Sequence, residues 1–347
     1  MSSTKAASNT IARTQVLQAN RHSYAYRRFG SGFGLPLLFL QHFTGTLDNW
    51  DPAVTDPLAS GREVILFDNA GLGRSTGEVP HTVAEMAGHA IAFLDGLGIK
   101  RCDVLGYSLG GMVALQMVQD RPLISRRMIL VGTAPRGGED IMHLEKPSLA
   151  KHLQDPTNRG YDVLKKIFFT SSRPSQAAGE AFIQRLSQRK EDLDPPAGPN
   201  VAGAQIAAFR EWETPIGQRF AELKTIPHPT LVVNGVNDEM IPVSNSYRLA
   251  ENMANAMQKI AAGQVAPVID TEVGYHLGRR HQGQGLATEA ARACLDHAFL
   301  TLRLQRVISL IRPENLPSRR VAERNGMSIE KETIFVGLPH LVYVAQK

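Results

Sequence analysis

Short apolar runs alternate along the first part of the chain with longer segments in which apolar residues recur every three or four positions. The runs are typical of strands buried on both faces, and the longer spacing is typical of amphipathic helices. Buried strands are expected at residues 35–41, 63–67, 103–107 and 127–131, and a helix at 83–97. Strands that alternate with helices predict an α/β fold with a mostly parallel sheet and crossover helices on both faces.

The strand pattern stops between residues 135 and 227 and resumes at 229–234. Helical spacing dominates this insertion, and a proline-rich stretch at 194–199 interrupts it. In parallel sheets, active sites lie at the carboxyl ends of the strands, and an insertion that follows a strand lies over that end. We therefore predict a helical lid that shapes a substrate pocket. An insertion without any such role is the alternative.

The composition is that of an ordinary globular protein. The chain has 347 residues, of which 43% are hydrophobic and 20% charged. The formal net charge of +5 is small for this length, and the basic residues are scattered, so a nucleic-acid partner is not expected. Two distant cysteines give no disulfide framework, and no metal site is predicted. No apolar run is long enough to span a bilayer and the first 20 residues do not resemble a signal peptide, so we expect a cytoplasmic protein without a membrane partner. The oligomeric state stays open.

The most informative motif lies between the strand at 103–107 and the helix that follows it. Gly106, Ser108 and Gly110 complete the pattern G-x-S-x-G there. A serine on so sharp a turn has unfavourable backbone angles, and flanking glycines let the strand and the helix approach closely enough to hold it. The hydroxyl is then presented at the positive end of a helix, where backbone N–H groups receive an oxyanion. We therefore favour Ser108 as a nucleophile over the alternative, a plain strand-to-helix turn.

Four motifs together resemble an α/β-hydrolase of the esterase and cofactor-free haloperoxidase type. They are Gln41-His42, residues 68–75, residues 106–110, and residues 235–238. The resemblance covers about residues 20–257 and implies a mostly parallel hydrolase sheet with a lid at about 135–227. It also implies hydrolysis of a small ester or a related small-molecule acyl substrate, without a cofactor.

The same resemblance assigns roles to single residues. Ser108 would be the nucleophile, and Asp238 would be the carboxylate that orients a histidine. The oxyanion donors would be the backbone N–H groups of Phe43 and Leu109. Phe43 stands where the family usually has glycine, which would narrow the pocket but keeps the N–H.

The histidine of such a triad has no clear counterpart. The family places it about 25 to 30 residues beyond the acid, and no histidine occurs between Asp238 and Tyr275. We therefore expect residues 1–257 to form a hydrolase domain that lacks its final strand and helix. Without a base the Ser108 hydroxyl stays protonated near neutral pH, so hydrolysis would be weak.

The end of the chain resembles the C-terminal half of a GNAT N-acetyltransferase. A strand pattern at 272–277 leads into Arg-His-Gln-Gly-Gln-Gly at 280–285, a helix at 286–300 and another strand at 306–311. The resemblance implies an α/β module that binds acetyl-CoA. Its contacts would come from Arg280, Gly283, Gly285, Asn315 and Ser318. The family's first half, which supplies much of the amine-acceptor site, has no counterpart, so residues 258–347 are expected to be a partial GNAT domain.

Because the two incomplete units are fused, the partial GNAT domain could supply the strand and helix that the hydrolase domain is expected to lack. The strand and helix of the second unit have the right order to dock as the missing strand and helix of the hydrolase sheet. His281, or less favourably His276, would then lie where the base belongs, whereas the alternative for His281 is a solvent-facing loop residue. Three functions follow: a weak serine hydrolase, which we favour, an acetyl-CoA-dependent N-acyltransferase, and a catalytically inactive fusion.

Overall fold

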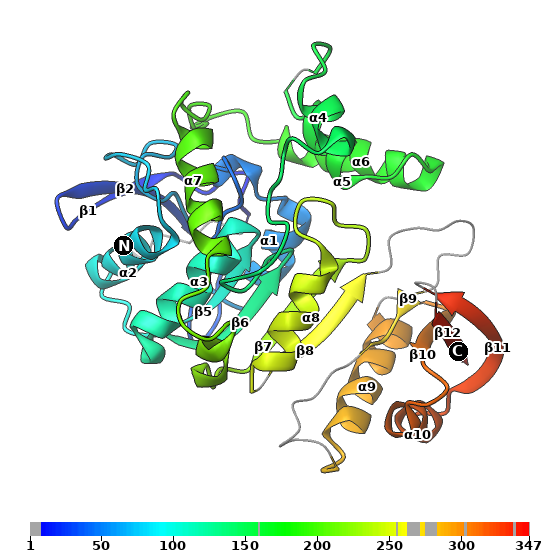
Figure 1. Ribbon diagram of the computed structural model, residues 1–347. Helices are drawn as coiled ribbons and strands as arrows, with labels where there is room; N and C mark the ends of the chain where they lie inside the picture. Colours follow the sequence, from blue (N-terminus) through cyan, green and yellow to red (C-terminus); the bar gives the residue numbers. More distant parts are fainter. Residues whose placement is uncertain are drawn as a thin grey trace.

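The computed structural model describes residues 8–158, 160–254, 256–261, 271–274, 283–301, 304–335 and 338–346, and places two sheets side by side (Figure 1). The larger sheet has eight strands in the order β1-β2-β4-β3-β5-β6-β7-β8. Their bounds are β1 Gln15–Ala19, β2 His22–Phe29, β3 Leu37–Leu40, β4 Val64–Phe67, β5 Cys102–Tyr107, β6 Ser125–Val131, β7 Thr230–Gly235 and β8 Ala256–Ala261. The pairs β1–β2 and β2–β4 are antiparallel and the other five are parallel, so the predicted mostly parallel sheet is confirmed.

Both faces of this sheet are covered. Side chains of β3 point alternately to the two faces, which is why all four of its residues are buried apolar ones. Leu38 and Leu40 face a core closed by helices α2 (Val83–Gly96), α3 (Leu109–Asp120), α7 (Val201–Glu213) and α8 (Val243–Asn252). Leu37 and Phe39 face a second core that includes Trp50 and the end of α1 (Pro52–Ala59).

The eighth strand corrects our expectation that the hydrolase domain ends at residue 257 without its final strand. β8 pairs parallel with β7, and Leu231 lies opposite Met257. In the sequence, Gln258 and Lys259 interrupt the apolar run, so the segment did not resemble a buried strand. β8 has a described neighbour on one side only, and polar residues are well tolerated in such an edge strand.

The insertion between β6 and β7 is helical, as predicted. It contains α4 (Pro147–Leu153), α5 (Asp162–Phe168), α6 (Arg173–Leu186), α7 and the 3-10 helix η3 (Ala221–Thr225). The helices α4, α5 and α6 form a lobe of their own at the top of Figure 1, whereas α7 lies against the body of the domain. Within the described ranges, no helix combines the length and the apolar character needed to cross a membrane.

The C-terminal unit has its own sheet and its own core. Strands β9 (Thr271–Glu272), β10 (Arg306–Ile311), β11 (Ser328–Phe335) and β12 (Leu338–Gln346) follow the order β11-β12-β10-β9, with α9 (Leu286–Asp296), the π-helix η5 (His297–Thr301) and α10 (Leu316–Arg324) beside them. β9 pairs parallel with β10. Apolar residues of α9, such as Leu295, share a buried cluster with Val307 and Tyr343.

This packing corrects the hypothesis that the second unit completes the first sheet. β9 and α9 are committed to the C-terminal core, so they do not serve as the missing strand and covering helix. The reason is local: β10 and β12 already offer the partner strand and the apolar face that β9 and α9 need.

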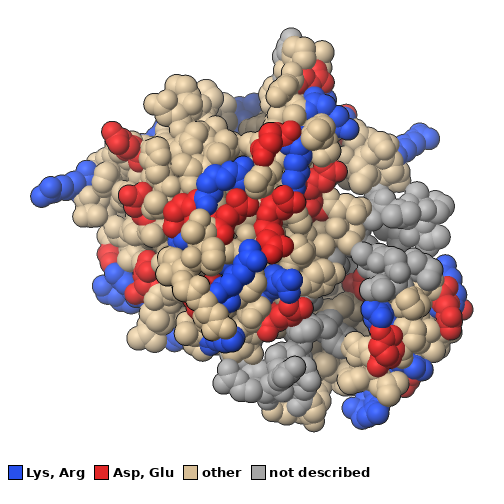
Figure 2. All heavy atoms as spheres, in the orientation of Figure 1, with Lys and Arg blue, Asp and Glu red and all other residues tan. Residues whose placement is uncertain are grey.

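Charged side chains are interspersed on the face of the molecule shown in Figure 2. Basic and acidic residues alternate there without a field of one sign. This distribution agrees with the small net charge of +5.

Candidate active site

Ser108 lies on the turn between β5 and α3 with backbone angles of φ 54° and ψ −117°. Few non-glycine residues adopt such angles, and they persist only where the surroundings impose them. Here the Ser108 N–H donates to Val131 O at 2.8 Å, and the Ser108 carbonyl accepts from Thr133 Oγ1 at 2.7 Å. None of the described residues hydrogen-bonds the Ser108 hydroxyl. The backbone is thus fixed while the hydroxyl is left available.

The two flanking glycines are required because a side chain at either position would collide with backbone atoms. A Cβ atom at Gly106 would lie 2.4 Å from Gly110 O, and one at Gly110 would lie 2.0 Å from Leu40 O. Both neighbours are backbone atoms that cannot turn aside. The G-x-S-x-G pattern therefore permits the close contact of α3 with β5 and β3 on which the turn depends.

The two predicted oxyanion donors lie on either side of this turn. Leu109 is the first residue of α3, and Phe43 lies in the loop after β3. In the described part of the chain, neither N–H donates to a protein acceptor. The loop around Phe43 is held by Gln205 of α7, whose Oε1 accepts the Thr44 N–H at 2.6 Å, and by Gln41, whose Nε2 donates to Thr46 O at 2.6 Å.

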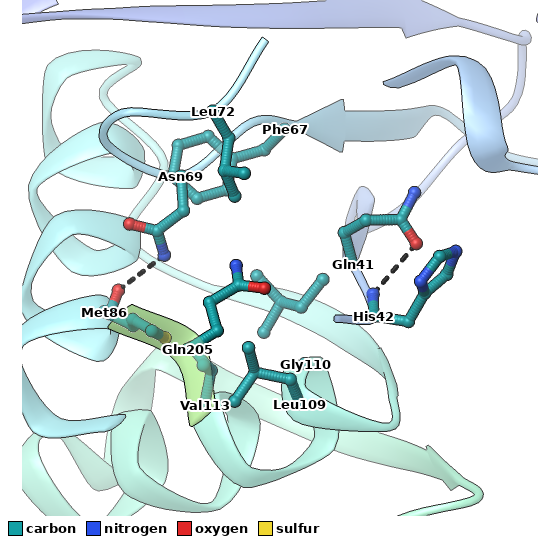
Figure 3. Close-up of a pocket in the computed structure, with 11 residues that line it drawn as sticks. Gln41, His42, Phe67, Asn69, Leu72, Met86, Leu109, Gly110, Val113 and Gln205 are labelled. Carbon is teal, nitrogen blue, oxygen red and sulfur yellow. Dashed lines mark hydrogen bonds between the residues drawn. The ribbon is translucent and has the colours of Figure 1, made fainter. Parts of the chain in front are cut away.

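A small cavity of about 30 Å³ opens beside Leu109 and Gly110 (Figure 3). Its floor is apolar and is made by Leu40, Phe67, Leu72, Met86, Leu109 and Val113. Four polar side chains, Gln41, His42, Asn69 and Gln205, complete the lining. Figure 3 shows Gln205 extending its amide from α7 into this space. A cavity of this size holds one or two water-sized groups.

Asp238 follows β7 at the same end of the sheet. Its Oδ1 accepts the N–H groups of Met240 at 3.0 Å and Ile241 at 2.9 Å. Its Oδ2 points toward Gly132, 3.5 Å from the position that a Cβ would take there. Gly132 directly follows Val131, the acceptor of the Ser108 N–H. Asp238 and Ser108 thus lie at the carboxyl ends of β7 and β5, which are separated by β6 alone, and Asp238 Oδ2 accepts no hydrogen bond from the described residues.

Burial raises the pKa of Asp238, although the N–H groups of Ile241 and Met240 oppose the shift. A desolvated carboxylate is stabilised by a nearby cation, so an imidazolium next to Oδ2 would be favoured. The predicted base, His281, lies outside the described residues, as do His276 and Arg280.

One described imidazole does lie at the site. The His42 ring contacts Tyr107 edge-on, with 5.3 Å between the ring centres, and its Nδ1 is 2.8 Å from Phe43 O. Burial lowers the pKa of His42 to about 4 against the opposing effect of the Phe43 carbonyl. The ring is therefore uncharged near neutral pH, and the contact with the carbonyl assigns the proton to Nδ1.

Sequence reasoning missed two residues of this site. His42 entered only as part of a motif, and Gln205 was not singled out at all. Gln205 is separated from Thr44 by 161 positions in the chain, so no local pattern could reveal their hydrogen bond. The spacing of Gln205 and Phe209, one helical turn apart, indicated only that both face the same way.

The C-terminal unit presents a different glycine-rich turn. Gly283 and Gly285 both have φ of 79°, and no atom of the described residues lies within 4 Å of a Cβ placed on either. Gly285 is also the residue from which α9 begins. These glycines are thus favoured by backbone conformation, and their surroundings are open.

A cavity of about 150 Å³ lies beside β9 and β10 in this unit. It is lined by Val273, Gly274, Ser309, Leu310, Ile311, Arg312, Asn315, Ser318 and His340. The predicted contacts Asn315 and Ser318 therefore lie together, and the Asn315 side chain caps α10 by accepting the Ser318 N–H at 3.2 Å. Arg280, another predicted contact, is outside the described residues.

Comparison with known proteins agrees with both resemblances. Residues 36–264 match the family described as alpha/beta hydrolase fold, which is more than half of the chain. An α/β-hydrolase-fold protein from Chitinophaga pinensis is 38% identical, superimposes with a TM-score of 0.68, and is covered over 90% of its length by 74% of this chain. The chain belongs to the α/β-hydrolase family. Residues 247–328 of this hydrolase match a second family, the GNAT acetyltransferase domain.

Two curated relatives of this α/β hydrolase are enzymes by name. A candidate carbamate hydrolase, RutD from Variovorax paradoxus, is 28% identical over 236 residues, which are 66% of this chain and 83% of RutD. The 2-hydroxymuconate semialdehyde hydrolase of Pseudomonas sp. strain CF600 is 28% identical over 237 residues, which are 65% of this chain and 78% of that enzyme. These likenesses support hydrolase function and leave the catalytic residues and the substrate open.

Proposed function

We propose that this protein hydrolyses a small ester or a related acyl compound through Ser108. The observation that carries the proposal is the strained turn, which leaves the Ser108 hydroxyl without a described partner, while the N–H groups of Phe43 and Leu109 donate to no described acceptor. Asp238, two strands away at the same end of the sheet, would add the carboxylate that such a nucleophile needs. The relatives are named for a carbamate and a semialdehyde, both small carbonyl compounds, which suits a small carbonyl substrate here.

In this mechanism Ser108 Oγ attacks the substrate carbonyl carbon and its proton passes to an imidazole. The carbonyl oxygen becomes an oxyanion and accepts the N–H groups of Phe43 and Leu109. The leaving alcohol departs with the proton from the imidazolium, and an acyl-serine ester remains. Water then attacks this ester with the same imidazole as base, which releases the acid and restores Ser108. We keep His281 as the proposed imidazole, oriented by Asp238, although the docking that first suggested it is excluded, because His281 itself lies outside the described residues.

A fluorophosphonate probe and a p-nitrophenyl ester test the proposal in the full chain. We expect probe labelling at Ser108 and slow ester hydrolysis, with Ser108→Ala losing both by a factor of about 10³ or more. Asp238→Asn should reduce both rates with little change in folding. Equal labelling and turnover in Ser108→Ala would show that the site is not a serine hydrolase.

The identity of the base is tested separately. His281→Ala should slow labelling as strongly as Asp238→Asn, and His297→Ala, a histidine at the end of α9, is the matched control that should leave labelling unchanged. Full Ser108-dependent activity in His281→Ala would refute the assignment of the base while leaving the nucleophile in place. Loss in His42→Gln alone would then point to the imidazole next to Tyr107.

A second candidate function is acetyl-CoA binding by the C-terminal unit. The cavity beside Asn315 and Ser318 and the open turn at Gly283 and Gly285 favour it. These residues would hold the pyrophosphate and the pantetheine arm, and the bound group would supply an acetyl thioester. Calorimetric titration with acetyl-CoA should show binding that Gly285→Ala weakens. No heat with acetyl-CoA and no labelling at Ser108 would together support the inactive fusion.

A further inference from the structure

A pair of acidic side chains joins the lid to the body of the hydrolase domain. Asp68 follows β4 and is 1% exposed, and Asp194 is half-buried in the segment that returns from α6 to α7. Both approach Gly73, where a Cβ would lie 2.1 Å from Asp68 Oδ2 and 3.3 Å from Asp194 Cγ. The two carboxyl groups therefore meet across this glycine.

None of the four oxygens of the pair has a hydrogen-bond partner among the described residues. The two neighbouring carboxylates, Asp48 and Asp192, do have donors. Asp48 accepts from Arg27 Nη2 at 2.7 Å and from the Asp194 N–H at 2.6 Å. Asp192 accepts the Thr14 N–H at 2.7 Å and pairs with Arg74 at 2.8 Å. Asp48 and Asp192 thus accept hydrogen bonds from the described residues, whereas Asp68 and Asp194 accept none within hydrogen-bonding geometry.

The charges around the pair do not balance. The groups that face it are Asp48 of the 3-10 helix η1 (Leu47–Asn49), Arg27 of β2, Arg74 of the glycine-rich turn, and Arg189 and Asp192 of the segment after α6. The Leu47 N–H also faces both carboxyl groups, and Arg27 Nη1 has no described partner. Together with the pair, four carboxyl groups meet three guanidinium groups.

One proton bound by the pair would remove this excess of one negative charge. An unpaired buried carboxylate is costly, and two carboxylates that share a site favour one protonated and one ionised member. The proton removes one negative charge and at the same time supplies the missing donor. A metal ion is a poorer solution, because the fully buried Arg27 side chain would lie beside it.

We propose that Asp68 and Asp194 share one proton, and that this proton fastens the return segment of the lid, residues 187–200, onto the turn at residues 68–75. When the pair is fully ionised, the two carboxylates repel each other and the return segment loosens. The lid therefore opens more readily as the pH rises. This inference does not depend on the chemistry of Ser108.

The direction of the pH effect follows from the same surroundings. Burial raises the pKa of Asp68, the Asp194 charge adds to the shift, and Arg27 opposes it. Burial and the Asp48 charge raise the pKa of Asp194 from its ordinary 3.8 to about 6, against Arg27 and Arg74. The folded state therefore binds the proton more tightly than the unfolded chain does. The resulting stabilisation is complete below about pH 4 and is lost as the pH rises through about 6.

Thermal unfolding of the full chain at several pH values tests the proposal with isosteric variants. At pH 8, Asp194→Asn should unfold about 3 °C above the unmodified protein, because the variant no longer carries the excess charge, and at pH 5 the difference should be about half as large. Asp68→Asn should behave in the same way. Asp192→Asn is the matched control: interactions that include the Thr14 N–H and Arg74 outweigh burial and lower the pKa of Asp192, so its effect should be the same at both pH values.

Two further measurements keep the test independent of variant folding. The infrared spectrum of the unmodified protein at pH 5 should contain the C=O stretching band of a protonated carboxyl that is lost by pH 8. Amide exchange in residues 187–200 should be faster in the unmodified protein than in Asp194→Asn at pH 8, and this difference should be smaller at pH 5. An unmodified protein without that band, or an Asp194→Asn variant whose unfolding temperature follows it at every pH, would overturn the proposal.

Discussion

The two glycine-bounded turns of this chain differ in what requires their glycines. At Gly106 and Gly110, a Cβ would collide with backbone atoms 2.4 and 2.0 Å away. At Gly283 and Gly285, the space is open and only the φ of 79° disfavours a side chain. The first turn is therefore fixed by the packing of a complete eight-stranded sheet, whereas the second depends on local backbone preference. A short motif has a reliable geometry where its neighbours leave no alternative.

The same contrast holds for the two units as a whole. The hydrolase unit has one sheet of eight described strands and two hydrophobic cores, one on each face of that sheet. The GNAT-like unit has four described strands and a single small cluster around Val307 and Tyr343. The described apolar clusters of the two units are separate, so the two units share a chain without sharing a core.

The largest effect that would sharpen the comparison is expected at Gly110. The substitution Gly110→Ala places a Cβ against Leu40 O, which cannot turn aside, and should destabilise the hydrolase unit by about 4 kcal/mol. Calorimetry should show its transition lowered by about 10 °C. Gly203→Ala in α7 is the control, since Gly203 is exposed with open space around it, and should be neutral or stabilise by about 1 kcal/mol. Equal behaviour of the two variants would contradict the packing argument.

The separation of the cores predicts two independent unfolding transitions. Phe93→Ala removes a fully buried ring from the hydrolase core and should cost about 3 kcal/mol in one transition. Val307→Ala removes a fully buried side chain from the C-terminal core and should cost about 2 kcal/mol in the other. Differential scanning calorimetry of the full chain measures both. A single transition lowered by both variants would show that the two units unfold together.

In the hydrolase unit, Asp103 forms ion pairs with Arg62 and Arg126 that make the stability of this unit depend on pH. Burial tends to raise the pKa of Asp103, but hydrogen bonds from Arg126 and Arg62 outweigh it and lower the pKa. The stabilisation is therefore present at neutral pH and is lost as the pH falls below the ordinary 3.8 through the lowered folded-state pKa. Asp103→Asn should cost about 2 kcal/mol at pH 7, less than a fully buried pair, because the Arg126 side chain is 40% exposed.

The pair between Arg306 and Glu330 in the C-terminal unit is the matched comparison. It is more exposed, so Glu330→Gln should shift the second transition less than Asp103→Asn shifts the first. Urea unfolding at pH 7 and pH 4 measures both variants. A larger loss for Glu330→Gln, or a deficit in Asp103→Asn that grows toward acid pH, would be inconsistent with these assignments.

The smallest effect is expected at the open glycine turn. Gly285→Ala meets no atom, so only the left-handed backbone opposes it, at about 1 kcal/mol. Gly274→Ala, at a position without positive φ, should cost less. Urea unfolding of the C-terminal transition should resolve the difference. A cost at Gly285 as large as that at Gly110 would remove the distinction between conformation and space.

Much of the fold could be predicted because its signals are local. The parallel strands appear as short apolar runs, and the turn at Ser108 follows from a glycine pattern between a strand and a helix. The eighth strand was missed because Gln258 and Lys259 break the apolar pattern at the edge of the sheet. The docking of the second unit was wrong because β10 and β12 compete for the same strand and helix, which a linear order of elements does not reveal.

The parts of the site that could not be predicted are held by contacts between distant segments. Gln205 reaches Thr44 from the lid, and Asp194 reaches Asp68 across Gly73. Neither pair has a spacing or a composition that identifies it in the sequence. Such contacts depend on how the lid returns to the body of the domain, and only the three-dimensional structure gives this path.

The outer side of β8 has a consequence for how the protein behaves in concentrated solution. Among the described strands, none pairs with this side, and an edge strand without a partner is where a strand from another molecule can add. Lys259 in the middle of β8 is the kind of residue that discourages such growth, since stacking copies would bring like charges together. Replacing this lysine with valine should therefore lower the concentration at which the protein begins to precipitate.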